Sequence, residues 1–245
     1  MFKRNKTRRR RSSRQRGPVA RAFFFLVKAG VWFVVLSVGW VLLYKVVPVP
    51  ITATMLMDPN GHTKDWTPLS RIDRNMVDAA IAGEDGKFCS HHGFDTGAIE
   101  KAIAHNQRVD RRGRGHIRGG STISQQTAKN VFLWQGGGYV RKAFEAWFTV
   151  LIENIWGKRR IMEVYLNIAQ TGIGTYGAEA GAQRYYRKGA AKLSSIEAAR
   201  IAAVLPLPDE RAVNGATGFT RRHGNTIAAR IGVVRRDGLD ACIYR

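Results

Sequence analysis

The first strong pattern in the chain is a long apolar run near its start. Residues 22–47 form 26 positions of almost continuous apolar character, and their only charged residues are Lys28 and Lys45 near the two ends. A bilayer core is spanned by about 20 apolar residues of helix, and lysines near the ends can extend toward the headgroups. The pattern therefore predicts a single transmembrane helix over 22–47.

A cleaved signal peptide is the alternative interpretation of this run. Its apolar region would span about 7–15 residues and would end in a small-residue cleavage site. Here the run is longer and continues into Pro48 and Pro50, which make a poor cleavage site and a stiff exit. We therefore favour a retained anchor. Because residues 1–21 hold ten Lys and Arg residues, the positive-inside bias predicts a basic cytoplasmic tail, with everything after Pro50 outside.

From residue 66 onward the apolar positions follow a helical period. Helices are expected over 70–84, from Ser121 or Thr122 onward, over 141–156, over 159–168 and over 196–204, with the capping box Ser194-x-x-Glu197 before the last. Convincing alternating strands are absent, and 51–57 is the best short candidate. We expect a linker over 48–65 and a mainly α domain over 66–245, which is long enough to bury one core.

The charge of the chain is strongly positive and unevenly spread. There are 40 Lys and Arg residues against 18 Asp and Glu residues, a formal charge of +22. Residues 1–57 contain 12 of the basic residues and no acid, so the remainder holds 28 basic against 18 acidic residues, or +10. Such a balance suits nucleic acid, anionic lipid headgroups or a phosphate-bearing substrate. Because the predicted topology puts the domain outside, nucleic acid is excluded as its partner.

The cysteines and histidines give no metal-binding pattern. Cys89 and Cys242 are too few for a disulfide framework, and no CxxC or Cys/His zinc spacing occurs. A bridge between them could form in an oxidising compartment, but sequence alone cannot pair them, so we expect them unpaired. His91 and His92 fit no common ligand spacing, and a structural hydrogen-bonding role is favoured for a histidine there. We predict no metal site.

Two glutamates lie inside dense groups of polar residues. Glu84 opens a group that ends at Asp95, and Glu145 follows Arg141 at helical spacing. Between them, 119–130 supplies hydroxyls, amides and a lysine. Paired carboxylates among hydroxyls, amides and cations are typical of glycosyl chemistry, in which one carboxylate handles a proton and others manage the departing charge.

Each of these groups also has an ordinary structural interpretation. Ser121, Gln125 and Lys129 are spaced i, i+4, i+8, which stacks them along one stripe that can equally be a solvated helix face. Arg141 and Glu145 at i, i+4 can be a simple helix ion pair of about 0.2–0.5 kcal/mol. Phe88 is better explained as a core residue than as a substrate platform.

Taken together, the groups resemble the peptidoglycan glycosyltransferases, the lysozyme-like family that polymerises lipid II. The family's first motif, E-D-x-x-F-x-x-H-x-G-x-D, is matched by Glu84, Asp85, Phe88, His91, Gly93 and Asp95. The second motif, G-x-S-T-x-x-Q-Q-x-x-K-N, is matched by Gly119, Ser121, Thr122, Gln125, Gln126, Lys129 and Asn130. The third motif, R-K-x-x-E, is matched by Arg141, Lys142 and Glu145, and a fourth resembles 158–178. The resemblance covers residues 66–205.

The resemblance implies a lysozyme-like glycosyltransferase domain behind a single N-terminal transmembrane helix. Glu84 would be the general base that takes the proton from the 4-hydroxyl of the acceptor's N-acetylglucosamine, which attacks the donor's anomeric carbon with inversion. Undecaprenyl pyrophosphate would leave, with Glu145 assisting on the donor side. The implied substrate-binding residues are Asp85, Ser121, Thr122, Gln125, Gln126, Lys129, Asn130 and Arg141. No tightly bound cofactor is expected, although the family implies a divalent cation at the pyrophosphate.

The implied partners are lipid II, the nascent glycan chain and membrane lipids, and recruitment by division or elongation machinery stays open. The implied location is the inner membrane, with a periplasmic catalytic domain. Gln170 stands where single-domain members carry a glutamate, which puts the shape of the fourth motif in doubt. The S-x-x-K, S-x-N and K-T-G motifs of a transpeptidase are absent, so we expect the monofunctional form.

Two rival functions remain at this point. A lytic glycosidase of the same broad fold would use one acid glutamate on finished glycan and would have little need for Lys129, Arg141 or the two glutamines. A catalytically silent membrane scaffold would keep the fold alone, and the intact set of polar motif residues argues against it.

Overall fold

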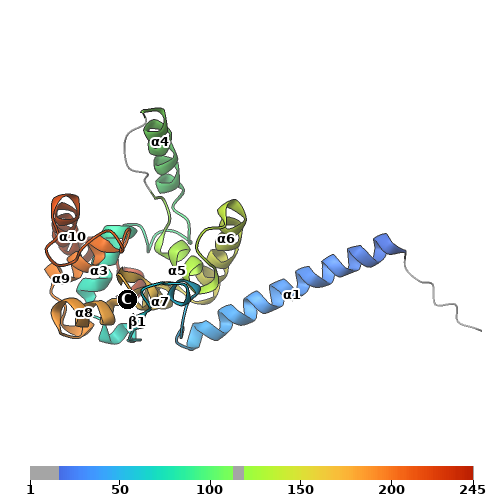
Figure 1. Ribbon diagram of the computed structural model, residues 1–245, viewed down its shortest axis with the longest axis horizontal. Coiled ribbons are helices and arrows are strands. Elements are labelled where there is room, and N and C mark those ends of the chain that lie inside the picture. Colours follow the sequence, from blue (N-terminus) through green and yellow to red (C-terminus); the bar gives the residue numbers. More distant parts are fainter. Residues whose placement is uncertain (1–16, 113–118, 245) are drawn as a thin grey trace, which may run out of the picture. The chain divides into compact units, whose positions relative to one another are not determined.

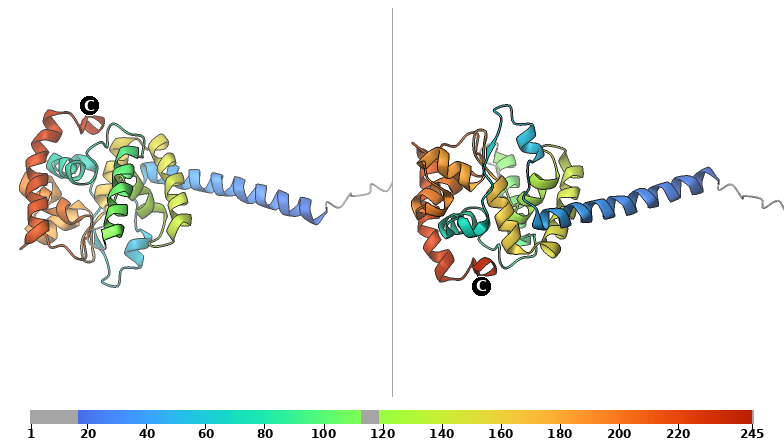
Figure 2. Two further views of the ribbon diagram at one scale, coloured as in Figure 1. Left: turned by 90° about the horizontal axis from the view of Figure 1, so that it is seen from above. Right: turned by 90° about the horizontal axis from the view of Figure 1, so that it is seen from below.

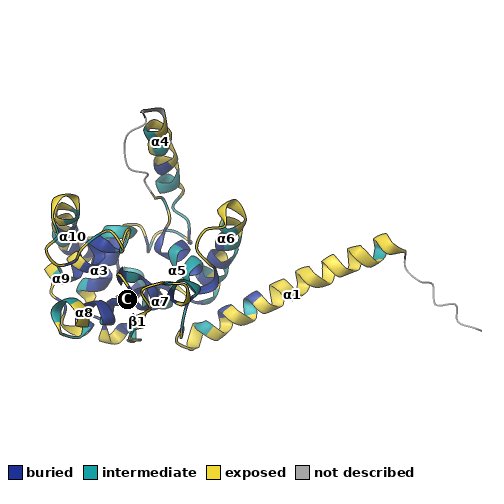
Figure 3. Cartoon of the chain, viewed as in Figure 1, coloured by how far each residue is buried: buried dark blue, intermediate teal, exposed yellow. Residues whose placement is uncertain are grey.

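The computed structural model describes residues 17–112 and 119–244, and it divides after Trp40 into two compact units (Figure 1). The first unit contains most of helix α1 (Pro18–Val46). α1 is long and apolar enough to cross a bilayer, and most of its side chains are exposed (Figure 3). It begins before the predicted residue 22 because proline is favoured in the first turn of a helix. Most of the predicted basic tail, residues 1–16, lies outside the described residues.

The second unit, from Val41 onward, is mainly α-helical, as predicted. Its α-helices are α2 (Ala53–Leu56), α3 (Arg74–Glu84), α4 (Thr96–Arg112), α5 (Ile123–Phe132), α6 (Gly138–Ile155), α7 (Lys158–Ile168), α8 (Ala178–Tyr186), α9 (Ser195–Val204), α10 (Gly218–Arg236) and α11 (Ala241–Tyr244). Three short strands, β1 (Thr63–Lys64), β2 (Gln170–Gly172) and β3 (Thr175–Tyr176), form a sheet in the order β1-β3-β2. β1 runs parallel to β3, and β2 antiparallel to it.

Two groups of helices meet in one core. α9 packs against both α3 and α10, and α5 packs against α6 and α7 (Figure 2). Ala198, Ala199 and Ala202 of α9 are fully buried, and their small side chains let α3 and α10 pack closely against this helix. α4 projects away from the other helices of this unit (Figure 1). The core therefore fixes α3 and α5, whose ends carry the predicted site residues.

Capping side chains mark the starts of α9, α5 and α3, and α3 starts later than predicted. Ser194 and Glu197 form the predicted capping box, and Thr122 caps α5. The helix expected from residue 70 begins at Arg74, because residues 69–71, which include Ser70, form a 3₁₀ turn and the Asp73 carboxylate accepts from the Asn75 N–H. An aspartate close to the first turn is a better cap than a serine three residues earlier.

The stretch expected as a linker belongs to the folded unit. Val49, Thr52 and Met55 are buried there. The best strand candidate, residues 51–57, does not form a strand, because Thr52 accepts a hydrogen bond from the Met55 N–H and opens the short helix α2. A threonine cap offered the backbone a local alternative to an extended conformation.

Helices α4, α8, α10 and α11 were not predicted from the sequence. Glycines inside α8 and α10 lower helix propensity, and α4 runs into a stretch rich in Gly and Arg, of which 113–118 lie outside the described residues. The packing explains the glycine of α8: a Cβ on Gly181 would lie 2.9 Å from the Thr171 Oγ1. Tertiary contacts therefore outweighed local propensity.

Cys89 and Cys242 form a disulfide, which overturns the expectation that they are unpaired. Their Cα atoms are 5.4 Å apart across 153 residues of sequence. The partner is brought in by α11, which packs on α7, and by the ion pair between Arg74 and Asp240 at 2.6 Å.

We predict that reduction of this bridge destabilises the domain by about 2–5 kcal/mol, because the bridge closes a long loop in the unfolded chain. The measurement is the guanidinium midpoint of the detergent-solubilised protein with and without reductant. The midpoint of the C89S/C242S variant should equal that of the reduced wild-type protein, and it should not change when reductant is added. An unchanged midpoint of the wild-type protein under full reduction would contradict the prediction.

Candidate active site

Glu84 is the last residue of α3 and lies against α5. The Gln126 side-chain N–H donates to the Glu84 Oε2 at 3.0 Å. The other oxygen, Oε1, is enclosed and has no hydrogen-bond partner among the described residues. α3 is held in place near this end by α10, since a Cβ on Gly83 would lie 2.9 Å from the Ile227 Cδ1. Because no hydrogen-bond donor from the described part of the chain lies beside Oε1, this oxygen can still accept a proton.

Burial raises the pKa of Glu84 above its ordinary value. The Gln126 hydrogen bond and the positive charge of Arg211 act in the opposite direction, and the charge of Asp85 adds to the rise. The Tyr165 hydroxyl is also buried without a partner among the described residues, and burial and the charges of Glu84 and Asp85 raise its pKa well above normal. Because its pKa is raised, the Glu84 carboxylate is a stronger base than an exposed glutamate.

Asp85 and His91 form a structural pair beside Glu84. The Gly93 N–H donates to the His91 Nδ1 at 3.1 Å, so the ring proton lies on Nε2, which donates to the Asp85 Oδ2 at 3.0 Å. The same Asp85 oxygen accepts from the Ile123 N–H at 3.0 Å. Asp85 is buried and ties the loop after α3 to the first residue of α5. The structural role predicted for a histidine in this loop is confirmed for His91.

The second motif divides into inward and outward residues. Thr122 and Gln125 are buried and form the capping box of α5, and the Thr122 hydroxyl also donates to the Gly93 carbonyl at 2.6 Å. Gln126, Lys129 and Asn130 are half-buried. The predicted stripe of Ser121, Gln125 and Lys129 is wrong, because Ser121 precedes the cap and is exposed, and Gln125 turns back to the Thr122 N–H.

Glu145 lies in a group of cations. Its side chain is only 3% exposed, and the Arg141 Nη1 donates to its Oε2 at 2.7 Å. The Lys142 ammonium binds its Oε1 and also reaches the Ser121 hydroxyl at 3.4 Å. Burial lowers the pKa of Lys129, which interacts with the charges of Glu145, Arg141 and Lys142. We call Lys129, Arg141 and Lys142 the cation cluster; three cations face one carboxylate.

One helix links the two glutamates. Gln126 of α5 contacts Glu84, and Lys129 of α5 interacts with Glu145. The two α5 residues are i and i+3, so they share a helix side and are separated by about 4.5 Å along its axis. The structure thus brings Glu84, Gln126, Lys129 and Glu145 together along α5.

The described residues do not fit a preformed divalent-cation site. Both Glu145 oxygens accept from cations. No group of three His, Cys, Asp or Glu side chains lies close enough to hold a metal in the described part of the chain. Positive charge at the Glu145 end comes from side chains.

Two residues at the site were missed from the sequence. Arg211 donates to the Ala203 carbonyl at 2.9 Å, lies 5.2 Å from the Phe219 ring centroid, and its charge acts on Glu84. Glu153 accepts from the Ser124 hydroxyl and from the Lys158 ammonium, at 2.6 Å for the latter, which braces α5 against α6. Glu153 follows Glu145 on α6 at i+8, about two helical turns later, and this spacing could have indicated it. No signal in the sequence indicated Arg211.

The fourth motif is structural in this fold. Arg160 donates to the carbonyls of Tyr44 and Val47, at 2.9 and 2.7 Å, where α1 ends. Gln170, which raised doubt about this motif, donates to the Asp209 Oδ1 at 2.8 Å. The motif thus holds residues 44–47 and the loop after α9 in place.

Comparison with known proteins gives consistent matches. The family model described as Transglycosylase matches residues 51–231. The chain is 49% identical over 225 residues to a biosynthetic peptidoglycan transglycosylase of Caulobacter vibrioides, covering 91% of this chain and 93% of the relative. It is 47% identical to proteins of the same description from Rhodospirillum centenum, covering 82% and 86% of the two chains, and Shigella boydii, covering 80% and 84%.

The environments of the two glutamates predict opposite effects on stability. The folded-state pKa of Glu84 lies above its unfolded value, so ionised Glu84 lowers the free energy of unfolding at any pH above both values. Glu84→Gln should therefore unfold at higher denaturant than wild type at pH 7.5, and this gain should vanish below about pH 4, where the unfolded chain also binds the proton. The measurement is the guanidinium midpoint at both pH values.

Glu145→Gln is the matched contrast. It leaves Arg141 and Lys142 without their carboxylate and should lower the free energy of unfolding by roughly 1–3 kcal/mol at pH 7.5. Equal midpoints for the two variants would contradict this assignment of environments.

Proposed function

The chain belongs to the transglycosylase family, and from this premise we propose that it polymerises the glycan strand of peptidoglycan. As an enzyme it is a glycosyltransferase, and its substrates are lipid II and the growing glycan chain. The proposed reaction moves that chain from undecaprenyl pyrophosphate to the 4-hydroxyl of the N-acetylglucosamine of lipid II, with inversion. The observation that supports the proposal is α5, whose Gln126 contacts Glu84 and whose Lys129, one turn later, interacts with Glu145.

Glu84 is the proposed general base at the acceptor end. It takes the proton of the 4-hydroxyl as that oxygen attacks the anomeric carbon of the donor, and the bond from this carbon to the phosphate oxygen breaks. The raised pKa and the unsatisfied Oε1 support this role. Gln126 holds the other carboxylate oxygen and so orients the base.

Inversion requires a single displacement with no covalent sugar–enzyme intermediate. A retaining enzyme would need a second carboxylate as nucleophile. Glu145 is poorly suited to that task, because Arg141 and Lys142 occupy both of its oxygens. This engagement supports the inverting reaction, with Glu145 orienting cations on the donor side.

The cation cluster is the proposed receiver of the departing pyrophosphate. Charge builds on phosphate oxygens as the bond breaks, and preorganised cations stabilise such charge most strongly when they are partly shielded from water. Lys129 is half-buried and Arg141 is 16% exposed at its side chain. Ser121, exposed beside Lys142, and the half-buried Asn130 are proposed as neutral donors to the substrate.

Asp85, Thr122 and Gln125 are better proposed as positioning residues than as substrate contacts. Each uses its polar atoms inside the protein, Asp85 toward His91 and Ile123, the other two within the α5 cap. They hold the base and α5 in register.

We further propose that α1 is a single-pass anchor of the inner membrane, with a cytoplasmic N-terminus and a periplasmic catalytic domain. The basic residues 1–21 and the disulfide both support that orientation. Membrane lipids are then partners of α1, and recruitment by division or elongation machinery stays a hypothesis. No step of the proposed reaction is assigned to a cofactor.

Glu84→Gln should lower the rate of lipid II polymerisation by at least about 10²–10⁴-fold, because loss of a general base removes that much. Glu100→Gln, at an exposed position of α4, is the control and should keep wild-type activity. The measurement is the length and amount of uncross-linked glycan formed by the purified, detergent-solubilised protein.

A Glu84→Gln variant that retains wild-type polymer length and rate would sink the assignment of the base. Release of short muropeptides from finished sacculi by wild-type protein, with no consumption of lipid II, would favour the lytic alternative. A wild-type protein with neither activity would favour the silent scaffold.

A protease added outside spheroplasts should digest the chain beyond Pro50 and leave a small membrane-embedded fragment. A tag placed at the N-terminus should stay protected until the membrane is opened. Protection of the catalytic domain in intact spheroplasts would overturn the proposed orientation.

A further inference from the structure

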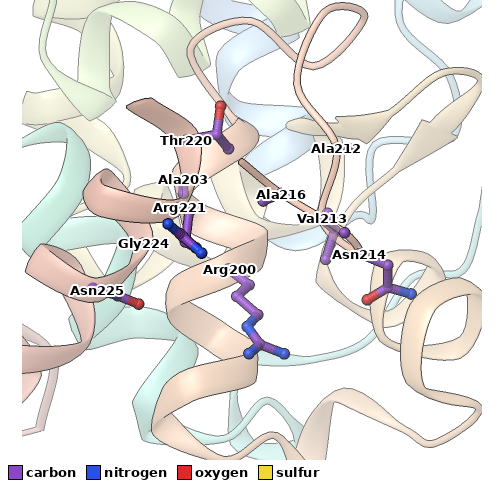
Figure 4. Close-up of a pocket in the computed structure, with 11 residues that line it drawn as sticks. Arg200, Ala203, Ala212, Val213, Asn214, Ala216, Thr220, Arg221, Gly224 and Asn225 are labelled. Carbon is purple, nitrogen blue, oxygen red and sulfur yellow. The ribbon is translucent and has the colours of Figure 1, made fainter. Parts of the chain in front are cut away.

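A cavity of about 250 Å³ opens between α9, α10 and the loop that joins them (Figure 4). Arg200 reaches it from α9, Thr220, Arg221 and Asn225 from α10, and Asn214 from the loop. Its volume lies just below the range of about 300–1,000 Å³ that holds whole drug-sized ligands. The cavity therefore suits one part of a larger molecule.

The lining of this cavity is cationic and rich in hydrogen-bond donors. No aspartate or glutamate contributes to it among the residues described. Arg200 and Arg221 form no ion pair with a carboxylate in the described part of the chain. Two guanidinium groups beside two carboxamides and a hydroxyl are the donors that recognise a carboxylate or a phosphate.

The cavity adjoins the Glu84 end of the site. Ala203, one of its lining residues, accepts the Arg211 hydrogen bond through its carbonyl, and Arg211 is the cation whose charge reaches Glu84. On the other wall, Gly224 packs against Ala203, and Ile227, one turn along α10, packs against Gly83. Arg211 and this packed contact between α3, α9 and α10 thus connect the cavity wall with the Glu84 end of the site.

We propose that this α9–α10 pocket binds an anionic group of the acceptor while the acceptor's sugar hydroxyl faces Glu84. The inference rests on the proposed function, because it takes the Glu84 end as the acceptor end. An acceptor lipid II carries two kinds of anion that fit this chemistry, the carboxylates of its peptide and its pyrophosphate. The pocket recognises one of them through Arg200 and Arg221, and this contact selects and orients the acceptor before transfer.

The experiment uses the full-length protein in detergent, a fixed preformed lipid-linked glycan as donor, and three acceptors. These are unmodified lipid II, lipid II with every peptide carboxylate amidated, and lipid II with a monophosphate in place of the pyrophosphate. Wild type should show a KM about tenfold higher for one modified acceptor, the loss expected for one charge-assisted hydrogen bond. A rise on amidation identifies the peptide as the anion, and a rise on phosphate removal identifies the headgroup.

The R200Q/R221Q variant should show that raised KM already with unmodified lipid II, and no further rise with the same modified acceptor. Its kcat should stay near wild type, because Glu84 and the cation cluster are intact. The control K192A/R222A removes two exposed charges of the same region outside the pocket and should behave as wild type.

Equal KM values of wild type for all three acceptors would overturn the proposal, and so would a double variant that still discriminates between them. The wild-type comparison stands alone if the double variant fails to fold, which its thermal melt would reveal. Absence of any polymerisation by wild type would instead defeat the proposed function, so the two failures are distinguishable.

Discussion

The carboxylate of Asp85 is the interaction on which the site depends. One of its oxygens receives the Ile123 N–H at the start of α5 and the ring N–H of His91. It follows Glu84 directly in the chain, so the same short segment carries the base and fixes the helix opposite it. If α5 shifted along its axis, Gln126 would leave Glu84 and Lys129 would leave Glu145 together. A buried charge-assisted hydrogen bond of this kind sets register more than it adds stability.

The two glutamates are physically opposite in a way that their shared residue type hides. Glu145 is buried, and both of its oxygens already accept hydrogen bonds from cations. Glu84 is held by one amide and leaves an oxygen unsatisfied, so its charge is disfavoured. A site that must take up a proton needs the second environment, and a site that must hold cations for a phosphate needs the first.

Local rules predicted what local chemistry decides. Neighbours along the chain decide the capping box at Ser194, the helix start near Thr122, the spacing of Arg141 and Glu145, and the apolar run of α1. The pairing of Cys89 with Cys242 does not, because it depends on where α11 docks after 153 residues. Arg211 belongs to the same class: its effect on Glu84 exists only because the loop after α9 folds back toward α3.

The positively charged side chains of the domain have different roles, which its net charge alone does not reveal. Some arginines neutralise buried carboxylates: Arg235 contacts Asp78, and burial still raises the pKa of Asp78 to about 6. The cation cluster faces one carboxylate and keeps an excess for a phosphate. Arg200 and Arg221 face no carboxylate. Cations that are already paired cannot recognise a ligand without losing their partner, so cations without a carboxylate partner that gather at one cavity, as Arg200 and Arg221 do, are better suited to bind an anionic group.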